Sequence, residues 1–68
     1  QIVYNDSDVE VFNFGKHKGR TVEEVFQKEP SYYEWMMKGE FPLYTKKLIT
    51  AIKLRMFGKQ VQIKNIKK

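Results

Sequence analysis

Three cations and the only histidine of the chain lie within residues 16–20. Gly15 precedes this run, and Gly19 lies inside it. Gly15 and Gly19 can adopt a positive φ without steric penalty, which predicts a tight turn. Such a turn frees backbone N–H groups, and these amides together with the cations Lys16, Lys18 and Arg20 are the groups that hold phosphate oxygens. The alternative is a turn whose charges serve only solubility.

The residues offer little for catalysis, so we expect no enzyme in this segment, no metal site and no cofactor. Residues 15–21 approach the phosphate loop of nucleotide hydrolases, but the glycine spacing is one residue short and arginine replaces the lysine. His17 has no nucleophile or carboxylate near it in the sequence to orient it. Asp6, Asp8 and Glu10 alternate along the chain, but no further acids cluster with them to complete a metal site.

The charge of the chain is uneven. The net charge is +5, and residues 46–68 carry eight cations and no acid. This asymmetry is typical of a surface that faces a polyanion, although solubility alone would also explain it. On a helix, Lys46, Lys47 and Lys53 would extend the positive surface of the loop.

Composition limits the chain to one small domain. The 68 residues contain no cysteine, so the core must come from aliphatic side chains and from one Trp, five Phe and four Tyr. No apolar run approaches the ~20 residues of a membrane span, and we expect a cytoplasmic protein without a membrane partner. Because the chain begins at Gln1 and not at Met, we expect it to be a piece of a longer protein.

The pattern predicts an α+β fold in which a small β-hairpin packs against about three short helices. Residues 9–14 alternate like a strand, and 20–22 are its expected return partner. Residues 1–8 are expected to be a linker, 9–58 the domain and 59–68 a basic tail, either a strand or a mobile arm.

Two short helices are predicted by similar capping signals. Thr21 with Glu24 fits a capping box, and Ser31 with Glu34 repeats it before a helix that ends near Gly39. On the second helix Tyr32, Trp35 and Met36 share one face, which predicts core positions more readily than a stacking surface for a cofactor.

A third helix is expected from residue 42 or 45 to Phe57, closed by Gly58. At 100° per residue one arc of this helix is apolar and the opposite arc is basic. The apolar arc contains Leu48, Ile49, Ala51, Ile52 and Met56, and the basic arc contains Lys46, Lys47, Thr50 and Lys53. Arg55 falls among the apolar positions, where it would either lie along the edge of the core or line a groove.

Three short motifs resemble a known family. The run from Phe14 to Arg20 (Phe-Gly-Lys-His-Lys-Gly-Arg), Val-Glu-Glu-Val at 22–25 and Pro-x-Tyr-x-x-Trp at 30–35 are similar to the exodeoxyribonuclease X-like C-terminal domain. Asn13 and Arg20 stand where that family often has proline and lysine. The resemblance covers roughly residues 11–55. It implies a module that follows a DEDD-type 3′–5′ exonuclease domain, as in proteins labelled DNA polymerase III epsilon subunit.

The residues and the resemblance together predict an accessory module for DNA replication or repair. We expect it to contact backbone phosphates, mostly independently of sequence, and to have DNA, the upstream exonuclease domain and polymerase subunits as partners. The expected nucleic-acid-binding residues are Lys16, His17, Lys18, Gly19, Arg20, Lys46, Lys47 and Lys53. The alternative is a module that docks the nuclease to a protein partner through Tyr33, Phe41 and Tyr44, provided that these side chains form one exposed patch.

Overall fold

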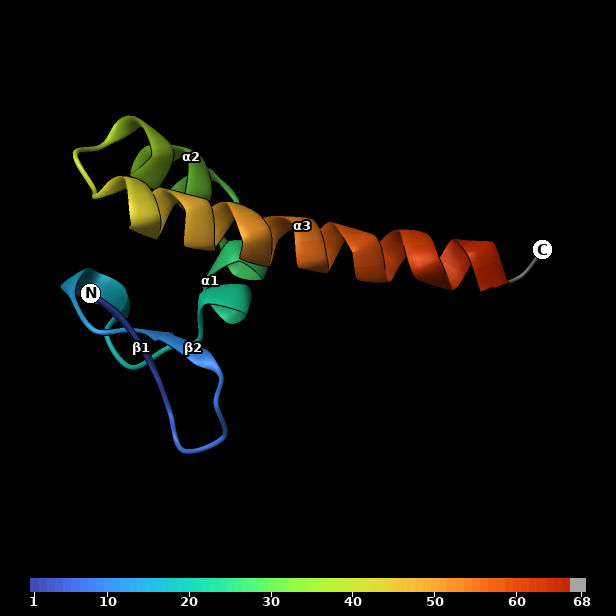
Figure 1. Cartoon of the computed structure of the whole chain (residues 1–68), viewed down its shortest axis with the longest axis horizontal. Helices are drawn as coiled ribbons and strands as arrows, with labels where there is room; N and C mark the ends of the chain where they lie inside the picture. The colour runs from blue at the N-terminus through green and yellow to red at the C-terminus, as the bar shows by residue number, and fades with distance from the viewer. Residues whose placement is uncertain (67–68) are drawn as a thin grey trace.

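The computed structural model describes the backbone of residues 1–66 and the side chains of residues 1–58, and it confirms the small α+β fold. The described elements are the strands β1 (Ile2–Tyr4) and β2 (Glu10–Phe12), a 3₁₀ turn η1 (Gly15–His17) and the helices α1 (Val22–Lys28), α2 (Ser31–Lys38) and α3 (Leu43–Ile66). Figure 1 shows α3 running across α1 and α2, with the hairpin below, and the second half of α3 projecting beyond the other elements.

The regular hairpin forms between β1 and β2, and the predicted return partner, residues 20–22, pairs with β2 over a shorter stretch than expected. The strands pair antiparallel with Ile2 opposite Phe12. Asn5 closes the turn because its side-chain oxygen accepts hydrogen bonds from the amides of Ser7 and Val9, at 2.8 and 3.1 Å. Residues 20–22 contribute an isolated bridge between Val11 and Thr21, and the Arg20 carbonyl accepts a hydrogen bond from the Phe12 amide. Part of the expected linker is therefore in the sheet, while the domain boundaries themselves stay a prediction.

The two short helices follow the predicted order, and one of the two predicted caps is confirmed. The Thr21 hydroxyl oxygen accepts a hydrogen bond from the Glu24 amide at 3.1 Å. Ser31 is the first residue of α2 and not its cap, because Pro30 takes the cap position with φ −58° and makes no side-chain capping bond. The φ that the proline ring fixes already suits a helix start. The end of α2 at Lys38, next to Gly39, agrees with the prediction.

The third helix is longer than predicted, because α3 continues through Gly58 to Ile66. One glycine inside a helix costs only about 1 kcal/mol relative to alanine, and the sequence beyond it contains no proline. The backbone of residues 59–66 therefore continues the helix, which replaces the strand or mobile arm expected there. Residues 67–68 of the expected tail lie outside the described residues.

The core lies between the hairpin and the three helices. The fully buried large side chains include Phe12, Phe26, Met36, Ile49 and Ile52, so the apolar arc of α3 is largely confirmed. The buried face also includes Thr45, whose hydroxyl donates to the Gln1 side-chain oxygen at 3.1 Å. Two expectations were wrong: Ala51 is exposed, and so is Trp35, at 56%.

Arg55 ties α3 to the rest of the fold through two acids, which we name the Arg55 cluster (Arg55, Glu10 and Glu23). Its guanidinium donates to both carboxylate oxygens of Glu10, at 3.0 and 3.3 Å, and to Glu23 at 2.9 Å. The hydrogen bonds from Arg55 lower the pKa of the Glu10 carboxyl. Glu10 is buried, and its desolvation raises this pKa, but the hydrogen bonds outweigh the desolvation and the net shift is downward. Of the two sequence alternatives for Arg55, the position at the edge of the core is the observed one.

Candidate nucleic-acid interface

The basic loop (residues 15–20) has the turn geometry that its glycines predicted. Gly15 has a φ of +70° and Gly19 a φ of +90°, both in the region that favours glycine. The amides of Lys18, Gly19 and Arg20 all donate to backbone carbonyls, those of Gly15, Phe12 and His17 respectively. The expected phosphate cradle of free amides was therefore wrong for these three residues, and only side chains can bind an anion there.

Two members of the basic loop contact one acid that the sequence argument overlooked. Glu29, at the end of α1, lies 3.4 Å from Lys16 Nζ and 3.2 Å from His17 Nε2. Desolvation raises the pKa of the Glu29 carboxyl, but the hydrogen bonds and charges of Lys16 and His17 outweigh it, so the net shift is downward. Glu29 is twelve residues beyond His17 in the chain, and only the turn between β2 and α1 brings the two together.

His17 is not positioned to stack on an incoming base. Its side chain is only 13% exposed. Its ring meets Tyr32 edge-on, with centroids 4.7 Å apart. The imidazole is therefore held between an aromatic ring and the Glu29 carboxylate, a structural position that the predicted DNA contact did not foresee.

Lys18 and Arg20 are the available cations of the loop. Both residues are exposed. Neither forms an ion pair with any residue that the structure describes, whereas Lys16 is paired with Glu29. Two of the three predicted loop cations are thus free to meet an external anion.

The predicted lysine stripe on α3 is divided. Lys46 and Lys53 are seven residues apart and share a helix face, but Lys47 lies about 100° away from Lys46. Lys53 Nζ lies over the rings of Tyr33 and Phe26, 5.4 and 6.0 Å from their centres. The structure thus gives Lys53 an intramolecular partner, whereas Lys46 and Lys47 lie in the first turns of α3.

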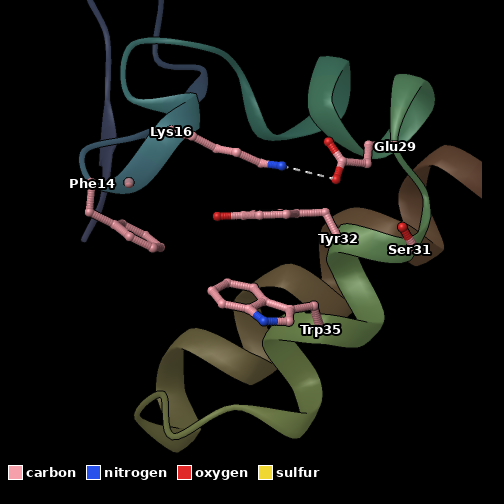
Figure 2. Close-up of a pocket in the computed structure, with 7 residues that line it drawn as sticks. Phe14, Lys16, Glu29, Ser31, Tyr32 and Trp35 are labelled. Atoms are coloured by element: carbon pink, nitrogen blue, oxygen red, sulfur yellow. Dashed lines mark hydrogen bonds and ion pairs between the residues drawn. The ribbon is translucent and has the colours of Figure 1, made fainter.

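A cleft of about 580 Å³ opens between the basic loop and α2. We name it the aromatic cleft; its lining residues are Phe14, Gly15, Lys16, Glu29, Ser31, Tyr32 and Trp35. Figure 2 shows the side chains of Tyr32 and Trp35 extending from the same side of α2 toward Phe14, with the ion pair of Lys16 and Glu29 above them. Burial raises the pKa of the Tyr32 hydroxyl above its ordinary value. The sequence assigned both rings to the core, although their spacing of three residues also fits two neighbours on a cleft wall.

The three aromatic residues expected to form a docking patch do not share an exposed surface. The Tyr33 hydroxyl lies 3.1 Å from the Thr50 hydroxyl and is partly buried. Phe41 packs on Trp35 and Phe14, with ring centroids 5.8 and 5.6 Å apart. Only Tyr44 is strongly exposed, at 68%. The condition for the alternative function, a contiguous exposed patch of these three rings, is not met.

The described residues form neither a metal-binding cluster nor a membrane-spanning helix. Among these residues, no three histidine, aspartate or glutamate side chains lie close enough together to bind a metal ion. Within the same part of the chain, no helix has the length and apolar character needed to cross a bilayer.

Residues 12–40 match the family model described as exodeoxyribonuclease X-like C-terminal. This range contains the basic loop, α1, α2 and every residue that lines the aromatic cleft. Neither the curated proteins nor the solved structures contain a match to the chain. The predicted resemblance to the exodeoxyribonuclease X-like C-terminal family is confirmed over residues 12–40.

Proposed function

We propose that this chain is a nucleic-acid-binding accessory module that lies C-terminal to a 3′–5′ exonuclease domain of the DNA polymerase III epsilon type. The observation that carries the proposal is the pair of exposed cations Lys18 and Arg20, which have no ion-pair partner among the described side chains and lie on a turn shaped by two glycines. The family match supports the exonuclease context. In this role the module holds DNA near an upstream catalytic domain and supplies no catalytic residue, metal ligand or cofactor site of its own.

Side chains carry the binding, because the amides of residues 18–20 already donate to backbone carbonyls. Arg20 offers a planar guanidinium that can pair with two phosphate oxygens, and Lys18 offers a point charge. Lys16, with a side chain that is 65% exposed, can turn from Glu29 to a phosphate. Lys46 and Lys47 extend the contact, whereas Lys53 contributes less because it lies over two rings. Phosphate contacts carry no sequence information, so the binding is mostly independent of sequence.

The proposed role fixes a cellular context. The partners are DNA, the exonuclease domain of the same polypeptide and polymerase subunits, in the cytoplasm and during replication or repair. Docking to a protein partner through Tyr33, Phe41 and Tyr44 is not proposed, because these rings do not form one surface.

The salt dependence of DNA binding tests the proposal. If about five phosphates are neutralised, the logarithm of the affinity falls with the logarithm of the salt concentration at a slope of roughly −3.5 to −4.5. Replacing Lys18 and Arg20 by glutamine should reduce the steepness of this slope by about 1.4–1.8. Fluorescence anisotropy of labelled oligonucleotides at several salt concentrations measures it.

The matched control removes the same charge from elsewhere on the domain. Lys28 on α1 and Lys38 on α2 are both exposed, and neither belongs to the loop. Replacing both by glutamine should leave the slope within about 0.5 of the original, because only local phosphate contacts release counterions. Equal flattening by the two double variants would show a response to net charge and would refute the loop as the binding site.

A further inference from the structure

Trp35 is exposed in a way that packing does not explain. It is the only tryptophan of the chain, and 56% of its surface remains accessible although its neighbours Tyr32 and Met36 are buried. Its indole stacks on Tyr32 with ring centroids 5.1 Å apart and meets Phe41 at 5.8 Å. The ring is thus held in a fixed orientation while much of its surface stays open. A rigid, exposed aromatic ring loses little conformational entropy when a ligand covers it.

The aromatic cleft has the size and lining of a site for a flat, partly polar ring. Its volume of about 580 Å³ lies within the range of small-ligand sites. Phe14 and Trp35 supply apolar walls, and Ser31 adds a hydroxyl at the start of α2. A nucleobase matches this chemistry because every base has a π-face for stacking and polar edges for hydrogen bonds.

Charge favours a nucleotide over an uncharged ring. Lys16 lines the cleft, with Nζ 6.0 Å from the centre of the Tyr32 ring. Lys18 and Arg20 follow it on the same loop. The Glu29 carboxylate, which would repel phosphate, is paired with Lys16 and hydrogen bonded to His17. A strand whose base enters the cleft would therefore meet the free cations with its neighbouring phosphates.

We propose that the aromatic cleft takes one unpaired nucleobase against Trp35, so that the module prefers single-stranded to duplex DNA. The inference rests on the proposed function and adds the form of DNA that the module selects. In a duplex both faces of each base are covered by its neighbours, and presenting one to the cleft requires unstacking and unpairing. A single strand presents its bases without that cost.

The fluorescence of Trp35 provides a direct test, because no other tryptophan contributes to the signal. The probes are a 12-nucleotide oligothymidylate, an abasic strand with the same phosphates, and a blunt duplex. Oligothymidylate should quench the tryptophan and bind about tenfold more tightly than the abasic strand. The abasic strand and the duplex should bind through the loop, as anisotropy would record, and should leave the fluorescence unchanged.

Variants separate the base site from the loop. Trp35→Leu should lower the affinity for oligothymidylate to that for the abasic strand and leave the salt slope unchanged, while Trp35→Phe should retain part of the difference. Tyr44→Leu removes another exposed aromatic ring, outside the cleft, and should bind like the original chain. If Trp35→Leu fails to fold, the comparison of the two strands with the unmodified chain still decides.

Three outcomes would overturn the inference, and they can be told apart. Equal affinity for oligothymidylate and the abasic strand would refute the base site and leave the phosphate-binding function standing. Absence of binding to all three DNA probes would refute the proposed function itself. Quenching by a proline-rich peptide, with none by oligothymidylate, would assign the cleft to a peptide, since aromatic grooves also bind that class of ligand.

Discussion

Arg55 and the basic loop hold the same kind of charge in opposite circumstances. Arg55 donates to a buried glutamate and to a second acid at distances of 2.9 to 3.3 Å. Lys18 and Arg20 are exposed and have no acidic partner among the described residues. The hydrogen bonds to Glu10 raise the pKa of Arg55 above its ordinary value. This cation is therefore held by contacts within the fold. Lys18 and Arg20 are positioned only by the backbone turn and stay open to an external anion.

The difference shows that burial of the partner decides which cations are structural. Glu10 is 8% exposed, and the desolvation of its carboxylate is offset chiefly by the hydrogen bonds from Arg55. The loop has no comparable buried acid, because the side chain of Glu29 is 39% exposed. Cations that look equivalent in the sequence therefore have different roles: Arg55 stabilises the domain, whereas Lys18 and Arg20 are available for binding.

The largest effect should come from removing the structural cation. Arg55→Ala leaves Glu10 buried without its partner, which costs several kcal/mol for a fully buried pair. Because the side chain of Arg55 is 43% exposed, we expect a smaller loss, about 2–3 kcal/mol, or a fall in Tm of about 10–20 °C. Thermal unfolding followed by circular dichroism measures it. The Tm of Arg55→Lys should lie between those of the original chain and Arg55→Ala, because lysine keeps the charge but lacks the planar guanidinium.

The control for this prediction is the loop. Arg20→Ala should change the free energy of unfolding by no more than about 0.5 kcal/mol, as for other exposed positions without a partner. If Arg20→Ala destabilised the domain as much as Arg55→Ala, the distinction between structural and available cations would be wrong.

Acid should weaken the Arg55 cluster by a smaller amount, because a protonated Glu10 can still accept a hydrogen bond. The folded-state pKa of Glu10 lies below its ordinary value of 4.5, so the unfolded chain binds more protons near that pH. The stabilisation is therefore complete above pH 4.5 and is lost as the pH falls through the lower, folded-state pKa. The difference in Tm between the original chain and Glu10→Gln should shrink below pH 4.5. A difference in Tm that stays constant from pH 7 to pH 3 would contradict the role of the Glu10 carboxylate. The titration of Glu29 occurs in both proteins and therefore does not contribute to this difference.

Local sequence signals predicted the elements better than their pairing. The Thr21 cap and the glycine turn depend on neighbouring residues, and both are observed. The partner of β2 depended on whether residues 5–8 would make a hairpin turn, and the Asn5 side chain decides this. Helix α3 passed its expected end because one glycine is a weak stop signal without a proline after it.

The candidate site was predicted in its charges and missed in its contacts. The cations of residues 16–20 are evident in the sequence, but Glu29 meets Lys16 and His17 across a turn and a helix. Trp35 was assigned to the core because helical periodicity gives a face and not the depth of burial. Recognising the aromatic cleft requires both the position of Glu29 beside the loop and the exposure of Trp35. The sequence alone indicates neither.

Two glycines test whether the backbone alone shapes the loop. An added Cβ would meet no atom within 4 Å at Gly19 or at Gly58, so steric contact affects neither substitution. Gly19→Ala should cost about 1–2 kcal/mol because its φ is +90°. Gly58→Ala lies inside α3 and should stabilise the domain by up to about 1 kcal/mol. Denaturant unfolding compares the two, and a change of the same sign in both would remove the backbone from the explanation of the loop.

The smallest effect on stability, and a gain in binding, is expected from Glu29→Gln. The Glu29 carboxylate is partly exposed and pairs with a lysine whose side chain is 65% exposed, so the Tm should not change measurably. Removing the acid releases Lys16 and deletes a negative charge beside the basic loop, which should tighten DNA binding about threefold at low salt and less at high salt. Glu24→Gln is the matched control, because Glu24 on α1 also pairs with an exposed lysine, Lys28, and contacts neither Lys16 nor His17 in any ion pair of the described residues. Anisotropy titrations at two salt concentrations compare the variants. Weaker DNA binding by Glu29→Gln would mean that Lys16 must be held by Glu29 to act, and the loop would then have one positioned and two free cations.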